Sequence, residues 1–170
     1  MIVRLIERRL KTKFGEFREI LYYDGQKEAI ALVLGDVEAQ ENVLCRIHSS
    51  CISAHVFNSV ECRCREEMEI SQALIERAGS GVVIYLEQEG KGNGHLALMA
   101  SIQYKKAGFK QSEAYEKAGF EADARSFRPA AEILADLKVE SIVLLTDNPK
   151  KAEDLRQFGI LVSAAKELGI

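Results

Sequence analysis

The stretch Gly81-Val-Val-Ile-Tyr-Leu86, followed directly by Glu87-Gln-Glu-Gly-Lys-Gly-Asn-Gly-His95, decides the fold class of this chain. The first part is an unbroken uncharged run rich in β-branched residues, which predicts a strand buried on both faces. The glycines at positions 90, 92 and 94 end this strand, and a helical pattern follows over residues 96–107. A buried strand that leads through a glycine turn into a helix is typical of an α/β protein.

The same alternation of helix and strand continues toward the C-terminus. Helical patterns over residues 112–118 and 130–137 precede a second buried strand at residues 141–146. A proline suited to the first helical position then opens the segment 149–158, and residues 160–164 predict a last strand. The C-terminal half is therefore expected to be α/β.

The N-terminal half has the pattern of strands and turns. Strands are predicted at residues 2–10, 14–23 and 29–34, and together they predict a small sheet. A helix then runs from residue 66 to a closing glycine at position 79. We expect an α/β (α+β) fold in which a β-rich N-terminal half packs with an α/β C-terminal half, as one domain over residues 1–170.

Composition narrows the class of protein. Of 170 residues, 47% are hydrophobic and 29% are charged, which excludes a disordered chain. The net charge of -3 gives no basic surplus for nucleic acid, and no apolar run is long enough for a membrane span. The charged N-terminus lacks a secretory signal, so a cytoplasmic protein with reduced thiols is expected. Cys45 lies in an apolar run and is expected in the core.

The other three cysteines, Cys51, Cys62 and Cys64, have the spacing C-x10-C-x-C. Two thiols only two residues apart reach one point from a tight turn, which favours a metal site. Three thiolates leave a fourth position open, and a catalytic zinc keeps that position for water. If His48 or His55 completes the shell, the site is structural instead. The alternative is that these cysteines are small buried hydrophobic residues.

Two loops are candidates for binding an anion. In residues 87–95 the glycines let backbone amides approach a phosphate and Lys91 adds charge, although a flexible turn explains the same pattern. Residues 146–151 join a strand end to a helix start that carries two lysines. Asp147 or Asn148 is expected to cap that helix.

Asp123 and Arg125 lie between these loops in an irregular stretch. Residues two apart can face the same way there, which offers a carboxylate for proton transfer beside a cation for a phosphate. A surface ion pair is the alternative interpretation of the same spacing.

These motifs together resemble GTP cyclohydrolase II. The residues that carry the resemblance are Arg46-Ile-His-Ser-Ser-Cys51, Cys62-Arg-Cys64, Gln88-Glu-Gly-Lys91, Gly119-Phe-Glu-Ala-Asp-Ala-Arg125 and Leu144-Leu-Thr-Asp-Asn-Pro-Lys-Lys151. In that family a zinc ion held by three cysteines activates water to open the imidazole ring of GTP at C8. Formate and pyrophosphate are released on the way to riboflavin. The resemblance implies the same fold and a homodimer.

Carried over by position, the resemblance implies a role for each matching residue. It implies Cys51, Cys62 and Cys64 as zinc ligands, Asp123 as the proton acceptor, and Arg125 as the group that attacks the α-phosphate. The substrate-binding positions that it implies are Arg46, His48, Ser49, Glu67, Glu89, Gly90, Lys91, Thr146 and Lys151. The cofactor would be Zn²⁺, with Mg²⁺ a candidate on the nucleotide phosphates, and the partner a small-molecule nucleotide.

This chain departs from the family inside the implied site. Ile102 stands where the family usually has a catalytic tyrosine, and an alkyl chain donates no proton, although Tyr104 is a candidate to cover that role. Glu67 replaces a glutamine; it shares a helical face with Ile70, so we expect it to point inward and to need a partner. The remaining departures are Ser50 for an acidic residue, Ala54-His55 for Gly-Asp, and Lys91 for an arginine.

Three functions therefore remain open. The first is a zinc-dependent cyclohydrolase that opens the ring of a nucleotide, with GTP as the first candidate. The second is a diverged homologue that opens a different base or retains the formyl group. The third is a zinc- or nucleotide-binding protein without catalysis, which the missing tyrosine would explain.

Overall fold

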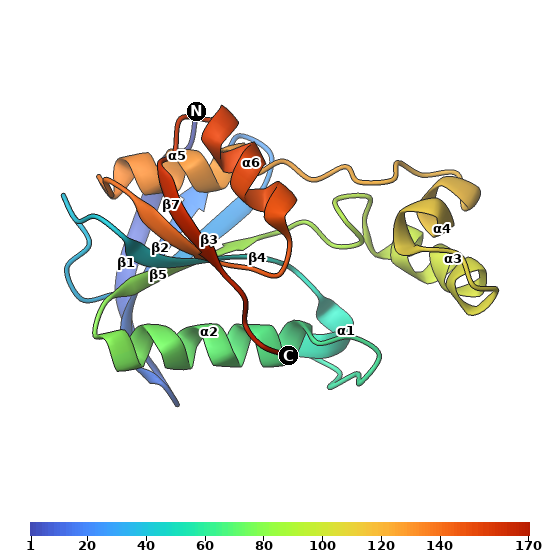
Figure 1. Ribbon diagram of the computed structural model, residues 1–170, viewed down its shortest axis with the longest axis horizontal. Helices are drawn as coiled ribbons and strands as arrows, with labels where there is room; N and C mark the ends of the chain where they lie inside the picture. The colour runs from blue at the N-terminus through green and yellow to red at the C-terminus, as the bar shows by residue number, and fades with distance from the viewer.

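The computed structural model describes all residues 1–170 and is built on one seven-stranded mixed sheet with helices on both faces (Figure 1). The strand order across the sheet is β1-β2-β3-β5-β4-β6-β7. The strands are β1 (Val3–Thr12), β2 (Gly15–Tyr23), β3 (Glu28–Leu34), β4 (Val43–Ser49), β5 (Gly81–Leu86), β6 (Ile142–Leu145) and β7 (Val162–Lys166). The helices are α1 (Ile52–His55), α2 (Cys64–Ala78), α3 (His95–Lys106), α4 (Gln111–Lys117), α5 (Arg128–Asp136) and α6 (Pro149–Gln157).

The sequence predicted a small sheet made of the N-terminal strands. In the structure these strands are part of the single seven-stranded sheet. β1, β2 and β3 are antiparallel neighbours, but β3 also pairs antiparallel with β5 through partners such as Ala29 and Leu86. From β5 onward the neighbouring strands β4, β6 and β7 are parallel. The pairing of β3 with β5 therefore joins the two halves of the chain in one sheet.

The inner strand β4, which lies between β5 and β6, has no counterpart among the predicted elements. Its side chains alternate between the two faces: Cys45 and Ile47 are fully buried in the main core, whereas Arg46 contacts α2 on the other face. The expectation that Cys45 packs in the core is confirmed. A strand that carries Arg46 and His48 lacks the continuous apolar run of a buried parallel strand, which is why the pattern was missed.

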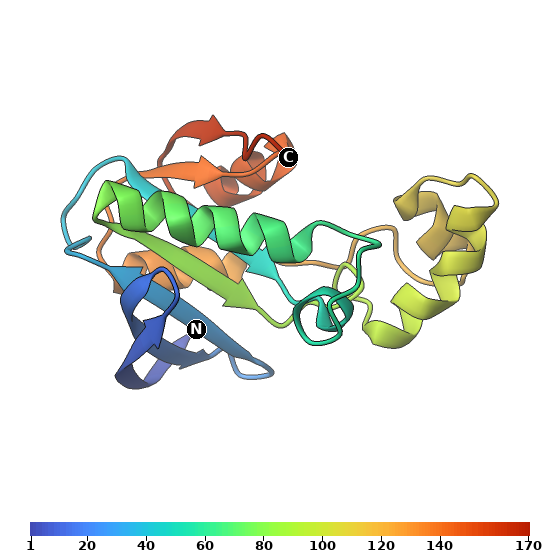
Figure 2. The same ribbon diagram turned by 90° about the horizontal axis from the view of Figure 1, so that it is seen from below.

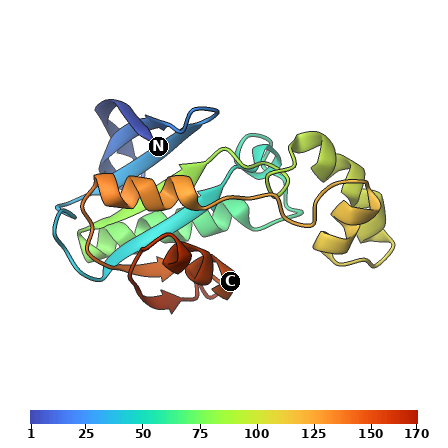
Figure 3. The same cartoon turned by 90° about the horizontal axis from the view of Figure 1, so that it is seen from above.

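Two layers of helices cover the sheet. α2 lies along one face, and α5 and α6 lie on the other (Figures 2 and 3). The larger hydrophobic cluster joins the sheet to α5 and α6, and a smaller one around Phe17, Ile75 and Leu168 includes the face under α2. Gly79 ends α2 in the left-handed conformation with φ +80°, as its place at the end of the predicted helix indicates.

α3 and α4 form a pair of helices that projects beyond one end of the sheet (Figure 1). The segments 87–94 and 118–127 connect this pair to β5 and α5. The connection from β4 to β5 crosses one face through α2, and the return to β6 crosses the other through α5. Connections that diverge in this way leave a crevice at the carboxyl ends of the strands, where α/β sheets bind ligands. No helix is both long and apolar enough to cross a membrane.

Candidate functional site

A cavity of ≈ 540 Å³ lies at the carboxyl ends of β4, β5 and β6 and extends to α3 and α4. Segments far apart in the sequence meet there, from the end of β4 to the start of α6. The predicted site residues that line it are Arg46, Ser49, Cys51, Cys62, Cys64, Glu67, Glu89, Gly90, Lys91, Arg125, Thr146 and Lys151. Two predicted residues, His48 and Asp123, do not line the cavity but contact residues that do.

The three cysteine thiols converge at this cavity. Their sulfur atoms all lie within 4.8 Å of one another, and Cys51 Sγ is 3.6 Å from Cys62 Sγ. A tetrahedral zinc ion with Zn–S bonds of about 2.3 Å needs sulfurs about 3.8 Å apart, so the spacing fits zinc. No histidine or carboxylate joins this group. His48 and His55 instead contact each other, with their Nε2 atoms 2.9 Å apart, so neither closes the shell.

Local contacts hold the cysteine loop in place. Cys51 is the N-cap residue of α1, and the Glu89 carboxylate accepts a hydrogen bond of 3.1 Å from the backbone N–H of Ile52. At the other end of α1, Arg65 donates to the carbonyls of Ala54 and His55 at 3.0 and 2.6 Å. A carboxylate at the start of a helix and a cation at its end both suit the helix dipole.

Burial makes the thiols harder to deprotonate. It raises the pKa of Cys51 and of Cys64, and the neighbouring sulfurs raise the pKa of Cys64 further. Three crowded thiols resist ionisation because their thiolates repel one another. A bound divalent cation removes this repulsion, so metal binding and thiol deprotonation are coupled at such a site.

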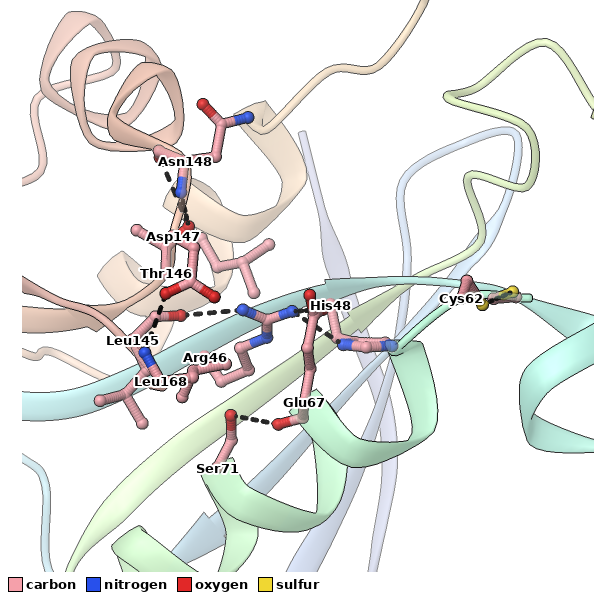
Figure 4. Close-up of polar contacts among 12 residues, drawn as sticks. Arg46, His48, Cys62, Glu67, Ser71, Leu145, Thr146, Asp147, Asn148 and Leu168 are labelled. Carbon is pink, nitrogen blue, oxygen red and sulfur yellow. Dashed lines mark hydrogen bonds and ion pairs between the residues drawn. The ribbon is translucent and has the colours of Figure 1, made fainter. Parts of the chain in front are cut away.

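Arg46 is the most connected side chain of the site (Figure 4). Its guanidinium is buried, forms an ion pair with Glu67 and donates to the carbonyl of Leu145 at 3.0 Å. The prediction that Glu67 points inward toward a partner is therefore confirmed. Arg46 also lies 3.3 Å from Nδ1 of His48, whose pKa falls to about 2 through burial and the Arg46 charge. His48 is therefore neutral, and Nδ1 is its acceptor.

The start of α6 forms the opposite wall. Asn148 caps the helix by accepting from the N–H of Lys150 at 3.0 Å, as the sequence predicted, and the buried hydroxyl of Thr146 accepts from the N–H of Asn148. Lys151 is buried and donates to the carbonyl of Ile47 at 3.2 Å. Burial, with Arg46 and Arg125 nearby, lowers its pKa to about 7. This concentration of positive charge suits an anionic ligand.

Asp123 and Arg125 form a two-pronged ion pair. Arg125 donates from Nε and Nη2 to the two carboxylate oxygens at 2.9 and 2.7 Å. Burial acts to raise the pKa of Asp123, but the hydrogen bonds from Arg125 outweigh it and hold the pKa below its usual value. Both side chains are largely buried, at 13% and 22% exposure, so this is not the surface pair of the alternative interpretation. Asp123 fixes the guanidinium of Arg125, which lines the cavity.

The glycine loop packs against the segment that carries this ion pair. Lys91 accepts at its carbonyl from the N–H of Ala124 at 2.9 Å, and its Nζ donates to Ser112 of α4 at 3.1 Å. A Cβ on Gly92 would lie 2.7 Å from the backbone of Ala124. The loop therefore positions Arg125 as well as lining the cavity.

Buried side-chain polar atoms without a hydrogen-bond partner are concentrated at this cavity. Four buried side-chain atoms in the whole chain have no hydrogen-bond partner, and all belong to residues that line it: Arg46 Nε, Ser49 Oγ, Gln88 Oε1 and Tyr115 Oη. Buried polar atoms are nearly always paired in folded proteins, so their concentration here indicates a ligand site. A second cavity of ≈ 530 Å³ contains none of these atoms, and its cations pair with local carboxylates such as Asp136 and Glu38.

Sequence reasoning missed two lining residues on α4. Gln111 and Tyr115 both line the cavity, and their i, i+4 spacing is the one signal that places them on a common helical face. Ile102 lines the cavity as its position implied, whereas Tyr104, the candidate to cover for it, does not.

Comparison with known proteins identifies the relatives. A family model described as GTP cyclohydrolase II matches residues 3–167. A "Riboflavin biosynthesis protein RibBA" of Bacillus cereus (strain B4264) is 42% identical over 164 residues, which is 95% of this chain and 41% of the relative. The protein of the same name from Bacillus mycoides (strain KBAB4) is 41% identical over 165 residues, or 96% of this chain and 42% of the relative. This chain therefore spans about two fifths of the length of these relatives.

Among solved structures, RibBX of A. baumannii, described as a two domain 3,4-dihydroxy-2-butanone 4-phosphate synthase, matches with a TM-score of 0.53 and 19% identity. The match covers 98% of this chain and 39% of that protein. At this identity the likeness concerns the fold alone.

Proposed function

The chain belongs to the GTP cyclohydrolase II family, and we propose that it is a zinc-dependent cyclohydrolase that opens the heterocyclic ring of a nucleotide, with GTP as the first candidate. One observation carries the proposal. Three thiols at zinc-binding distances lie on the same cavity as every unpartnered buried polar atom of the chain. A place in riboflavin biosynthesis, where its relatives are named, is part of the proposal.

Cys51, Cys62 and Cys64 would hold the zinc ion. The chemistry that zinc supplies at a three-thiolate site is Lewis-acid activation of water. Glu89 keeps Cys51 in position through the start of α1. The arrangement leaves the cavity side of the cysteine cluster free of further protein ligands, which an enzyme needs and a structural site does not.

The opposite wall would bind the phosphates. Lys151, Arg125 and Lys91 bring positive charge to the cavity from three different segments, and Mg²⁺ on the phosphates belongs to the same proposal. Asp123 holds the guanidinium of Arg125 in a fixed plane at the cavity, where it would contact the α-phosphate. The ionised Asp123 is also the proposed proton acceptor.

The second candidate is a homologue that opens the ring but retains the formyl group, or acts on another base. The observation that favours it is Ile102, which lines the cavity beside Leu98 and Met99 and supplies no proton donor. The α3 residues with donors in the lining, His95 and Lys105, are at other positions of the helix. Proton transfer by a placed side chain is typically worth about 100-fold or more. Slow formate release from GTP would therefore accompany ring opening in this case. A homodimer and a single domain remain part of the proposal and are checked by light scattering and by the number of unfolding transitions.

The test begins with the metal. Purified protein is expected to carry one zinc per chain, and Cys62→Ser with Cys64→Ser to abolish it, because two of three ligands are lost. Cys45→Ala is the matched control, since this thiol lies in the core away from the cluster and its loss should leave the zinc content unchanged. Zinc retained at the wild-type level by the double serine variant would contradict the assignment.

The second part of the test uses nucleotides. Zinc-loaded protein is incubated with GTP and a panel of other nucleotides, and ring opening, formate and pyrophosphate are followed by ultraviolet spectra and mass spectrometry. Arg125→Ala and Lys151→Ala should weaken nucleotide binding because each removes a cation from the cavity wall. A wild-type chain that binds nucleotides without changing them would make it a binding protein, and one that ignores them would end the proposal.

A further inference from the structure

Tyr115 is the one phenol that lines the cavity, and its hydroxyl makes no hydrogen bond of normal geometry within the fold. The side chain is fully buried on α4, and its Oη has no hydrogen-bond partner. A buried hydroxyl without a partner is unfavourable, because it loses its hydrogen bonds to water on folding. A phenylalanine would fill the same space without that cost, so the presence of the oxygen calls for a partner that the chain does not supply.

The other fully buried tyrosine shows what a structural phenol looks like in this molecule. Tyr22 lies in the main core on β2, and its hydroxyl donates to the Asp136 carboxylate at 2.7 Å. The phenol that packs in the core therefore has a hydrogen-bond partner within the fold. Tyr115 differs from Tyr22 in lacking a partner and in lying on the cavity.

The surroundings of Tyr115 suit a flat heteroaromatic ring. The neighbouring helix α3 contributes the apolar side chains of Leu98, Met99 and Ile102 to a cavity whose lining is otherwise mostly polar. One turn before Tyr115, Gln111 also reaches the lining. A mostly apolar wall with a few polar groups is the usual form of a site for a small organic ring. The phosphate-binding cations lie on other segments, around Lys151 and Arg125.

We propose that the hydroxyl of Tyr115 donates a hydrogen bond to the heteroaromatic base of the substrate, so that α4 supplies a donor beside the apolar side chains of Leu98, Met99 and Ile102. The inference rests on the proposed function, because it takes a nucleotide as the ligand. The hydroxyl is buried, so contact with a ligand requires neighbouring side chains to move. The donor then stabilises negative charge that develops on the ring during attack by water.

The protonation of Tyr115 is consistent with a donor. Burial raises the pKa of its phenol, and this effect outweighs the opposing influence of the nearby Gln111 and Ser101 side chains. The group therefore keeps its proton across the physiological range. A neutral phenol can donate to a ring nitrogen or carbonyl, whereas a phenolate can only accept.

The experiment compares three tyrosine variants in the zinc-loaded protein. Tyr115→Phe removes only the oxygen, so the melting temperature should stay the same or rise, while kcat for ring opening falls by about 10- to 100-fold and KM changes by less than about 3-fold. Tyr104→Phe changes a phenol on α3 outside the cavity and should alter neither quantity. Tyr22→Phe removes the hydrogen bond to Asp136 and should lower the melting temperature without changing kcat.

Two results would overturn the proposal. If Tyr115→Phe matches the wild type in both kcat and nucleotide affinity, the hydroxyl does not touch the substrate. If Tyr115→Phe melts at a clearly lower temperature, the hydroxyl has a structural partner and its role is in the fold. A wild-type chain that neither binds nor transforms any nucleotide marks the failure of the proposed function itself, and the role of Tyr115 falls with it.

Discussion

Arg46 connects the fold of this protein to its candidate site. Arg46 lies on the inner strand β4, and only 4% of its side chain is exposed. Its guanidinium contacts α2 through Glu67 and the end of β6 through Leu145. A buried guanidinium needs a counter-charge, because desolvation of an isolated ion is costly. Glu67 supplies that charge, so a carboxylate in place of an amide has a structural reason in this chain.

The ion pair predicts the effect of Glu67→Gln. Glutamine can still accept a hydrogen bond but leaves the Arg46 charge uncompensated, so the free energy of unfolding should fall by about 1–3 kcal/mol. Glu69→Gln on the same helix is the control, because Glu69 pairs with Lys13 at an exposed position and should cost less than about 0.5 kcal/mol. Urea denaturation of the two variants measures the difference, and equal values would show that Glu67 does not neutralise Arg46.

At the scale of elements, the glycine loop of residues 87–94 connects β5 to the helix pair α3 and α4. Gly92 and Gly94 both have positive φ values, +84° and +96°, which favour glycine. Their surroundings differ, since a Cβ at Gly92 would collide with the backbone of Ala124, whereas a Cβ at Gly94 meets nothing within 4 Å. The backbone of the loop at Gly92 therefore lies too close to the segment of Asp123 and Arg125 to leave room for a side chain.

This difference makes Gly92→Ala and Gly94→Ala a matched pair. Both substitutions should cost about 1–2 kcal/mol of stability because alanine is strained at positive φ. Gly92→Ala should cost more than Gly94→Ala, because its Cβ would also collide with the backbone of Ala124. Only Gly92→Ala should also displace Arg125, and a misplacement of about 1 Å can cost up to about 100-fold in rate. Steady-state kinetics should show kcat/KM at least about 10-fold lower for Gly92→Ala than for Gly94→Ala. Similar kinetics for both variants would mean that the contact with Ala124 does not position the site.

At the scale of the whole molecule, the core and the cysteine loop are separate. Neither hydrophobic cluster includes a residue from the segment 51–64 that carries the three thiols. The clusters instead join the sheet to the helices on its two faces. The fold should therefore be stable without metal, unlike small domains that fold only around zinc.

Metal removal tests this separation. A chelator should strip the zinc and lower the melting temperature, because a ligand that binds only the folded state stabilises it. The far-UV circular dichroism at 25 °C should remain that of the folded protein, since the sheet and its helices keep their packing. Re-addition of zinc should restore the melting temperature. Loss of secondary structure on chelation would show that the cysteine cluster is part of the core.

Features that depend on local contacts were predicted from the sequence, whereas features that depend on distant contacts were not. Hydrophobic period and end signals predicted β5 (Gly81–Leu86) at its observed bounds, and α2 up to its cap at Gly79. The proline at the start of α6 and the cap at Asn148 were also predicted. The spacing of the three cysteines was sufficient to propose a metal site that the geometry fits. Of the 14 site residues that the family resemblance indicated, 12 line the cavity.

These features were accessible because each depends on residues within a few positions of one another, where period, capping and turn geometry act. The tertiary structure alone decided the place of β4 between β5 and β6, the pairing of Arg46 with Glu67 and the approach of Tyr115 to the cavity. Arg46 and the Leu145 carbonyl that it contacts are 99 residues apart in the chain. Such contacts follow from how the sheet and helices pack, and no local pattern encodes which distant side chain will neutralise a buried charge or leave a hydroxyl without a partner.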